Sequence, residues 1–305
     1  MSKHGRVDVI GVPMDLGADR RGVDMGPSAI RCTGILERVR RLGYECKDLG
    51  DVPVQLPESR DVAGSQAKYL EEIAEACDSL RAKVVSSLEQ GGIPIVAGGD
   101  HSIAMGTVAG VSEYHRSQGE KIGLLWVDAH ADMNTPESSP TGNIHGMPLA
   151  VCLGLGPDEL TGLGGFSPKV DRENTVLIGI RNLDEHEKQI VRDSGIHAYT
   201  MRDIDEHGMA AITHEAIGHL TKGTIGFHVS FDVDGLDPSV APGVGTPVRG
   251  GLRFREAHLL MELVADTGKV VSLEVTEVNP ILDHRNDTAE VAVDMLLSGL
   301  GKAIL

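Results

Sequence analysis

Aspartate and histidine side chains follow short apolar segments of this sequence at spacings that suit metal binding. The segments are Ile93–Ala97, Ile122–Val127 and Thr224–Phe231, and the residues that follow them include His101, Asp128, His130, Asp132, Asp232 and Asp234. Alternate residues of an extended chain project to the same side, so each set can present its ligands together. Carboxylate and imidazole ligands without thiolates favour Mn²⁺ over Zn²⁺, with Co²⁺, Ni²⁺ and Fe²⁺ as alternatives. The pattern therefore predicts a metal site.

The number of carboxylates indicates how many ions the site holds. Four carboxylates balance the charge of two divalent cations, whereas without metal they would repel one another in a poorly solvated cleft. Two ions can hold one hydroxide between them, which lowers the pKa of the parent water and directs the hydroxide at an electrophilic carbon. We therefore expect a binuclear site with hydrolytic chemistry.

Each of these residues also has an ordinary structural interpretation. A single aspartate after a strand is usually a helix cap or a turn residue, and a single histidine usually serves a hydrogen bond. Capping does not explain D-x-H-x-D and D-x-D together, each directly after an apolar segment. For two neighbours the structural interpretation is retained, because Asp100 can support His101 and Asp237 fits a turn.

The ligands need a scaffold that brings distant segments together. We expect strands at Val7–Val12, Ile93–Ala97, Ile122–Val127, Thr175–Ile180, Ile196–Tyr199, Thr224–Phe231 and Val270–Val275. We expect helices at about Pro27–Leu42, Val62–Gln90, Glu185–Ser194, Met201–Leu220, Arg255–Thr267 and Thr288–Gly301. Strands rich in Val and Ile indicate a sheet buried on both faces, and their alternation with helices indicates an α/β fold with a mainly parallel sheet. Ligands of such sheets bind outside the carboxyl ends of the strands, where the three segments above would meet Glu277, which follows the strand Val270–Val275.

Composition limits the class of protein and its partners. A formal charge of −17 argues against nucleic acid as a partner, because phosphate contacts need a basic face. No apolar segment is long enough to span a membrane, and Val7–Val12 is too short for a signal sequence, so we expect a cytoplasmic protein. No repeat or linker divides the chain, so residues 1–305 are expected to form a single domain.

These motifs resemble the ureohydrolase family, and most closely its arginase branch. The matching segments include Gly98–Ser102, Asp128–Asp132, Ser230–Pro238 and Glu277–Pro280, in the family order and over nearly the whole chain. The resemblance implies a three-layer α/β/α sandwich and two Mn²⁺ ions per subunit. It implies one ion held by His101, Asp128, Asp132 and Asp232, and a second held by Asp128, His130, Asp232 and Asp234. It also implies a homo-oligomer, either a trimer or a hexamer.

The resemblance implies a substrate through the loop after the second motif. In arginases a similar loop binds the amino-acid end of L-arginine, which agmatine lacks. The residues that would contact the α-carboxylate or α-ammonium group are Asn134, Ser139, Thr141, Asp184 and Glu187. Arginases commonly carry Ser where this chain has Thr141, which keeps the hydroxyl and adds a methyl group.

The same resemblance implies a reaction, the hydrolysis of L-arginine to L-ornithine and urea by a metal-bridging hydroxide. Glu277 would pair with the guanidinium group, to which its carboxylate is suited. Asp132 would orient the hydroxide or accept its proton, and His145 would relay a proton to the departing amine or to bulk water. Such an enzyme belongs to arginine metabolism and the urea cycle.

Three other functions are compatible with parts of the sequence. An agmatinase or another guanidino-compound amidinohydrolase would use the same metal pair without the amino-acid loop. A deacetylase of the related fold works with one zinc ion and lacks the full second ligand set, which here includes His101, Asp132 and Asp234. A catalytically silent metal-binding protein would keep the ligands without turnover, and a urea assay with metal analysis separates these cases.

Overall fold

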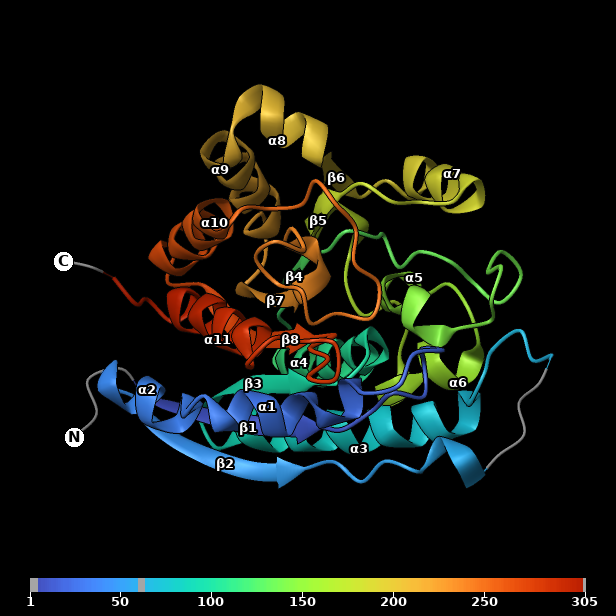
Figure 1. Cartoon of the computed structure of the whole chain (residues 1–305), viewed down its shortest axis with the longest axis horizontal. Coiled ribbons are helices and arrows are strands. Elements are labelled where there is room, and N and C mark those ends of the chain that lie inside the picture. Colours follow the sequence, from blue (N-terminus) through green and yellow to red (C-terminus); the bar gives the residue numbers. More distant parts are fainter. Residues whose placement is uncertain (1–4, 60–63, 304–305) are drawn as a thin grey trace.

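Eight parallel strands form one continuous sheet at the centre of the protein. The structure, a computed structural model, describes residues 5–59 and 64–303. The strands are β1 (Arg6–Val12), β2 (Glu45–Asp51), β3 (Gly92–Gly98), β4 (Ile122–Val127), β5 (Thr175–Ile180), β6 (His197–Thr200), β7 (Gly226–Asp232) and β8 (Val270–Thr276). Their order across the sheet is β2-β1-β3-β8-β7-β4-β5-β6, which Figure 1 shows from bottom to top. All pairs are parallel, as expected for strands buried on both faces.

Helices cover both faces of the sheet and create two hydrophobic cores. One face carries α1 (Gly26–Cys32), α2 (Ile35–Arg41), α8 (Met201–His207), α9 (Met209–Leu220), α10 (Phe254–Asp266) and α11 (Asp287–Gly299). The other carries α3 (Leu70–Glu89), α4 (Ala104–Arg116), α5 (Pro148–Cys152), α6 (Asp158–Thr161) and α7 (Glu185–Ser194). Strand residues alternate between the cores: Leu125 packs into the first and Trp126 into the second. The three-layer α/β/α sandwich is therefore confirmed.

Among the described strands and α-helices, four were not predicted from the sequence: β2, α4 and the short helices α5 and α6, which have five and four residues. The strand β2 lies at the sheet edge and buries only Cys46, so its polar sequence lacks the apolar signal of the central strands. The helix α4 is buried on almost every side, so it shows no polar face with helical period. In α4, Gly106 and Gly110 lie against the backbone of α3, where an added Cβ would come within 2.6 Å and 2.8 Å of carbonyl oxygens.

Three predicted helices differ from the observed ones. The segment Pro27–Leu42 forms α1 and α2, separated at Gly34, which has a left-handed φ of 75°. The segment Met201–Leu220 forms α8 and α9, separated at Gly208 with φ of 83°. The helix predicted from Val62 begins at Leu70, and its predicted start lies outside the described residues. Glycine readily adopts the positive φ that interrupts a helix.

The four central strands bring the acidic and histidine-bearing segments side by side. Strands β3, β8, β7 and β4 are consecutive neighbours in the sheet, and each precedes one of these segments. Their pairing aligns Ala97 with Val275, and Val127 with Phe231, near the ends of these strands. Residues far apart in sequence therefore meet at one edge of the sheet. Among the described residues, no helix has the length and hydrophobicity needed to span a membrane.

Candidate metal centre and active site

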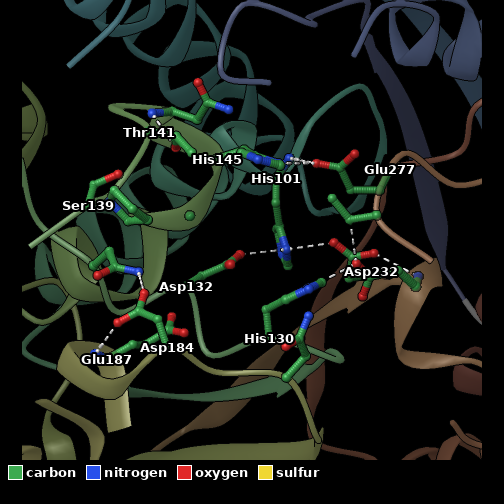
Figure 2. Close-up of a pocket in the computed structure, with 17 residues that line it drawn as sticks. His101, His130, Asp132, Ser139, Thr141, His145, Asp184, Glu187, Asp232 and Glu277 are labelled. Atoms are coloured by element: carbon green, nitrogen blue, oxygen red, sulfur yellow. Dashed lines mark hydrogen bonds and ion pairs between the residues drawn. The ribbon is translucent and has the colours of Figure 1, made fainter. Parts of the chain in front are cut away.

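A cleft of about 250 Å³ lies at the carboxyl ends of the central strands. This volume is somewhat below the ~300–1,000 Å³ usual for drug-sized ligands, so it suits a small metabolite. Its walls include His101, His130, Asp132, Asn134, Ser139, Thr141, His145, Asp184, Glu187, Asp232, Asp234 and Glu277. These are all of the site residues expected from the sequence except Asp128, which lies fully buried beside them. Figure 2 shows His101 between Asp132 and Asp232, with Ser139 and Thr141 on another wall.

The imidazole of His101 faces three carboxylates. Its Nδ1 atom lies 3.1 Å from Asp128, 3.1 Å from Asp132 and 3.0 Å from Asp232, yet makes no hydrogen bond within the described structure. Its Nε2 atom lies 2.8 Å from Oγ of Ser230. The hydrogen-bond partners of Ser230 decide which nitrogen of His101 carries the proton.

Ser230 donates its single hydroxyl proton to Oε1 of Glu274, across 2.6 Å. Its oxygen must then accept from Nε2–H of His101, so in the neutral imidazole, the form that binds metal, Nδ1 carries the lone pair. A lone pair directed at three carboxylate oxygens is repulsive unless a cation lies among them. This buried atom and its partners therefore fit a metal ion.

A second group of ligands lies around His130. Its Nδ1 atom is 3.0 Å from Oδ2 of Asp234 and 3.4 Å from Oδ1 of Asp128. Candidate metal ligands thus form two groups, His101–Asp128–Asp232 and Asp128–His130–Asp234. Asp128 belongs to both groups, as a carboxylate shared by two ions would.

Two hydrogen bonds hold the carboxylate of Asp128 in place, one from a side chain and one from the backbone. Its Oδ2 atom accepts a hydrogen bond of 3.0 Å from the Trp126 indole, and its Oδ1 atom accepts one of 2.7 Å from the backbone of His130. The Trp126 ring also stacks on His101, with ring centroids 4.1 Å apart. This role of Trp126 could not be predicted from the sequence, because its position in an apolar segment indicates only a core residue.

Burial and mutual repulsion prevent the carboxylates from all being charged without a cation. Burial, and then the charge of Asp128, raise the pKa of Asp132 to about 7. Burial and neighbouring carboxylates also raise the pKa of Asp232 and Asp234. The pKa of Asp128 is lowered, because the two adjacent imidazoles outweigh its burial. Divalent ions would replace the protons that this cluster otherwise retains.

Two residues of the cleft have strained backbones. Asp132 has φ of 52° and Glu277 has φ of 65°, both in the left-handed region that non-glycine residues rarely adopt. Such strain costs about 1–3 kcal/mol per residue and is concentrated at functional sites. The backbone thus supports a functional role for both carboxylates.

Glu277 links His145, which lies in the loop after the second motif, to the candidate metal ligands. Its Oε1 atom lies 3.0 Å from Nδ1 of His145 and accepts a 3.0 Å hydrogen bond from the backbone of His101. Burial alone would lower the pKa of His145, but the Glu277 carboxylate raises it to about 9. The pKa of Glu277 is lowered in turn, because His145 outweighs the effect of burial.

The other end of the cleft carries amide and hydroxyl groups. Asn134 donates to Asp184 across 3.0 Å. Ser139 accepts a 3.0 Å hydrogen bond from the backbone of Gly142, and Thr141 accepts one of 3.2 Å from Asn143. Because both hydroxyls act here as acceptors, their protons remain available for an anionic group.

Two acids at this end also have structural contacts. Asp184 caps α7 by accepting 2.9 Å hydrogen bonds from the backbones of His186 and Glu187, so its ordinary interpretation as a helix cap also holds. Glu187 accepts from the backbone of Met133 across 3.1 Å. Burial, and then the charge of Asp132, raise the pKa of Glu187 to about 8.

The structure also adds residues to the site. Thr246 lines the cleft and donates a 2.8 Å hydrogen bond to Oδ2 of Asp234. Asn143 and Asn182 line it as well. Thr246 lies in an irregular loop that carries no motif, so the sequence offered no signal for it. Asp237 accepts from Ser239, Gly250 and Gly251, in agreement with its predicted place in a turn.

Comparisons with known proteins agree with this geometry. The sequence model of the arginase family matches residues 5–301. Arginase from Bacillus caldovelox is 52% identical over 300 residues, which are 98% of this chain and 99% of the relative. The solved structure of B. caldovelox arginase superposes with a TM-score of 0.94 at 51% identity and full coverage of both chains. Entamoeba histolytica arginase, solved with L-ornithine, gives a TM-score of 0.90 at 30% identity, covering 99% of this chain and 100% of that one.

The protein is an α/β sandwich with an acidic, histidine-bearing cleft at the ends of its strands, and these relatives match it over its full length. These features identify the protein as a hydrolase. Within that class, the chain belongs to the arginase family, a branch of the ureohydrolases. The family depends on metal ions, and the two ligand groups around Asp128 are the candidate metal-binding residues in this chain.

Proposed function

We propose that this protein is a binuclear manganese enzyme that hydrolyses L-arginine to L-ornithine and urea. One observation carries the proposal: the two ligand groups around Asp128 share a cleft with Glu277 and with the polar loop from Asn134 to Thr141. A metal pair at one end and receptors for an amino acid at the other suit a substrate with both a guanidinium and an α-amino-acid group. The L-ornithine in the related E. histolytica structure supports this choice.

The chain has enough ligands for two ions. His101, Asp128, Asp132 and Asp232 would hold the first, and Asp128, His130, Asp232 and Asp234 the second. Imidazole and carboxylate ligands suit Mn²⁺. When bound, the ions would supply an activated water molecule as the nucleophile.

Glu277 and His145 would act on the guanidinium end of the substrate. The Glu277 carboxylate would pair with the guanidinium group, for which its depressed pKa keeps it charged. His145, with a pKa raised to about 9, would be protonated near neutral pH and would donate this proton to the departing amine. Asp132, as a ligand of the first ion, would orient the attacking water or accept its proton.

The loop would recognise the amino-acid end. Ser139 and Thr141 can donate hydroxyl protons to an α-carboxylate, and Asn134 lies beside them. Asp184 would attract the α-ammonium group, since its contacts with α7 and Asn134 lower its pKa despite partial burial. Glu187 is a secondary candidate for the same group.

The test is urea release by Mn²⁺-loaded enzyme with L-arginine and agmatine at equal concentration. We expect a strong preference for L-arginine. A preference for agmatine would keep the metal chemistry and reject the loop as an amino-acid receptor. Urea from neither substrate, with both ions bound, would reject the proposed reaction and favour a silent metal-binding protein.

Four further expectations stay predictions. They are a homo-oligomer, trimeric or hexameric by family analogy, a single domain, a cytoplasmic location, and a role in arginine metabolism such as the urea cycle. Sedimentation analysis of the purified protein would test the first.

A further inference from the structure

Arg181, directly after β5, is bonded to the backbone of the metal-site loops. Each of its three side-chain nitrogens donates to backbone carbonyls, with donor–acceptor distances between 2.7 and 3.3 Å. The accepting carbonyls are those of Gly179, Asp234, Gly235, Leu236 and Val248. None of these acceptors is a carboxylate, so the guanidinium is occupied by the fold rather than available to a ligand.

These bonds join three segments that surround one side of the site. The backbone N–H of Arg181 donates to the carbonyl of Ala129 across 2.9 Å. Ala129 separates the ligands Asp128 and His130, and its own N–H donates to Oδ1 of Asp234 across 3.2 Å. Through its backbone and its side chain, Arg181 therefore connects both ligand-bearing segments of this half of the site.

Asp234 is held from both ends by this arrangement. Arg181 binds its carbonyl oxygen at 2.7 Å, and Thr246 binds its Oδ2 atom at 2.8 Å. Thr246 belongs to the loop that Arg181 binds through Val248, at 2.8 Å. The close fit extends to Gly251, where an added Cβ would lie 2.5 Å from Nη2 of Arg181.

The other half of the site has separate supports. His101 is oriented by Ser230 and Glu274, and within the described structure neither of these residues forms a hydrogen bond or ion pair with Arg181. The two halves share Asp128 but depend on different neighbours.

We propose that Arg181 is a positioning residue for the metal ion bound by His130 and Asp234, and that it acts on this ion selectively. The inference rests on the two-ion site proposed above. An arginine is needed because its planar fork reaches several acceptors at once, whereas a lysine presents three donors from a single atom. Arg181→Lys keeps the charge and removes the fork, so it separates geometry from electrostatics.

The experiment measures Mn²⁺ binding to metal-free protein by titration, with the electron paramagnetic resonance of free Mn²⁺ as the signal. We expect wild type to bind two ions. Arg181→Lys should lower the affinity for one of the two ions by roughly 10- to 100-fold, which is the usual effect of losing a hydrogen bond that supports a metal ligand. Arg202→Lys is the matched control, because the side chain of Arg202 is 84% exposed and pairs with Glu206 rather than with the metal-site loops. This control should bind both ions as wild type does.

Double variants identify which ion is affected. In a His130→Asn background, where the same ion is already impaired, Arg181→Lys should add little further loss. In a His101→Asn background, Arg181→Lys should lower the affinity for the remaining ion by the same factor as in the single variant. Thr246→Val, which removes only the hydroxyl bonded to Asp234, is a milder variant should Arg181→Lys fold poorly, and it should weaken the same ion.

Three results would overturn the inference. Equal affinity of Arg181→Lys and wild type for both ions would remove any role in metal binding. An equal loss of affinity for both ions, with a lower melting temperature of the metal-free protein, would show that Arg181 supports the fold in general rather than one metal site. If wild type bound no Mn²⁺, the two-ion function itself would fail, which is distinct from either result.

Discussion

The imidazole of His145 and the carboxylate of Glu277 lie 3.0 Å apart, although 132 residues separate them in the sequence. The same oxygen of Glu277 accepts from the backbone of His101, a candidate metal ligand. This contact joins the proposed proton donor, the proposed guanidinium partner and the metal site. It also makes the proton affinity of His145 depend on one carboxylate.

Replacing Glu277 with Gln should lower the pKa of His145 from about 9 toward or below its ordinary 6.5. With the carboxylate gone, burial becomes the main influence, and burial disfavours the imidazolium. Imidazole resonances of the metal-free protein, followed by NMR against pH, measure this directly. An unchanged value near 9 in Glu277→Gln would mean that other acids control His145.

The same pair predicts how stability depends on pH. Because the folded pKa of His145 is raised, its stabilisation is complete below pH 6.5 and is lost as the pH rises toward about 9. The melting temperature of metal-free wild type should therefore fall more steeply over this range than that of Glu277→Gln. Parallel curves would contradict the ion pair.

Glu277→Gln should also separate catalysis from metal binding. Loss of a buried charge partner costs about 2–5 kcal/mol, so kcat/KM for L-arginine should fall by roughly 30- to 5,000-fold. Metal content should stay at the wild-type level, because Glu277 belongs to neither ligand group. Metal analysis after dialysis provides the check, and a loss of metal would make Glu277 a ligand or a structural support.

Asp128→Asn should remove both ions, because Asp128 is the residue common to the two ligand groups. The amide keeps the shape of the side chain but loses the charge that a shared ligand supplies. Urea release should fall by ~10³-fold or more, equivalent to about 4 kcal/mol of transition-state stabilisation. Turnover like that of wild type, with two ions retained, would reject the shared-ligand model.

Thr141 tests the amino-acid receptor. Thr141→Val removes the hydroxyl at nearly constant shape and should raise KM for L-arginine by roughly 10- to 100-fold, the value of a hydrogen bond to a charged group. Thr141→Ser restores the hydroxyl and should stay within about 3-fold of wild type, since only a methyl group is lost. Steady-state kinetics with agmatine serve as the control, because both variants should leave that substrate unaffected. An equal rise in KM for both substrates would argue against carboxylate recognition.

Ser230→Ala tests the orientation of His101. Without the hydroxyl, the Nε2 proton loses its partner, and the lone pair on Nδ1 is no longer fixed toward Asp128, Asp132 and Asp232. We expect Mn²⁺ to bind roughly 10- to 100-fold more weakly at one of the two sites. Calorimetric titration checks the affinity, and two unchanged sites would remove Ser230 from the metal centre.

The candidate metal ligands could be recognised in the sequence because they are local to their strands. Asp128, His130 and Asp132 directly follow the buried segment that becomes β4, but they do not continue as the extended chain that the alternation argument assumed, because β4 ends at Val127 and Asp132 has φ of 52°. The apolar segments likewise predicted the central strands, since strands buried on both faces need apolar residues throughout. The polar edge strand β2 and the buried helix α4 carry no such periodic signal, and both were missed.

Only the tertiary structure decided which residues support the ligands. Ser230, Glu274 and Thr246 act through contacts between segments far apart in the chain, and Arg181 reaches carbonyl groups that any residue type provides. The sequence by itself determined the ligand types and their order, because coordination chemistry depends on side-chain identity. The tertiary structure decided which nitrogen of His101 carries the proton, whether His145 is charged and which residues position Asp234. Each depends on contacts of about 3 Å between distant segments. Only the packing of β3, β8, β7 and β4 brings these segments together.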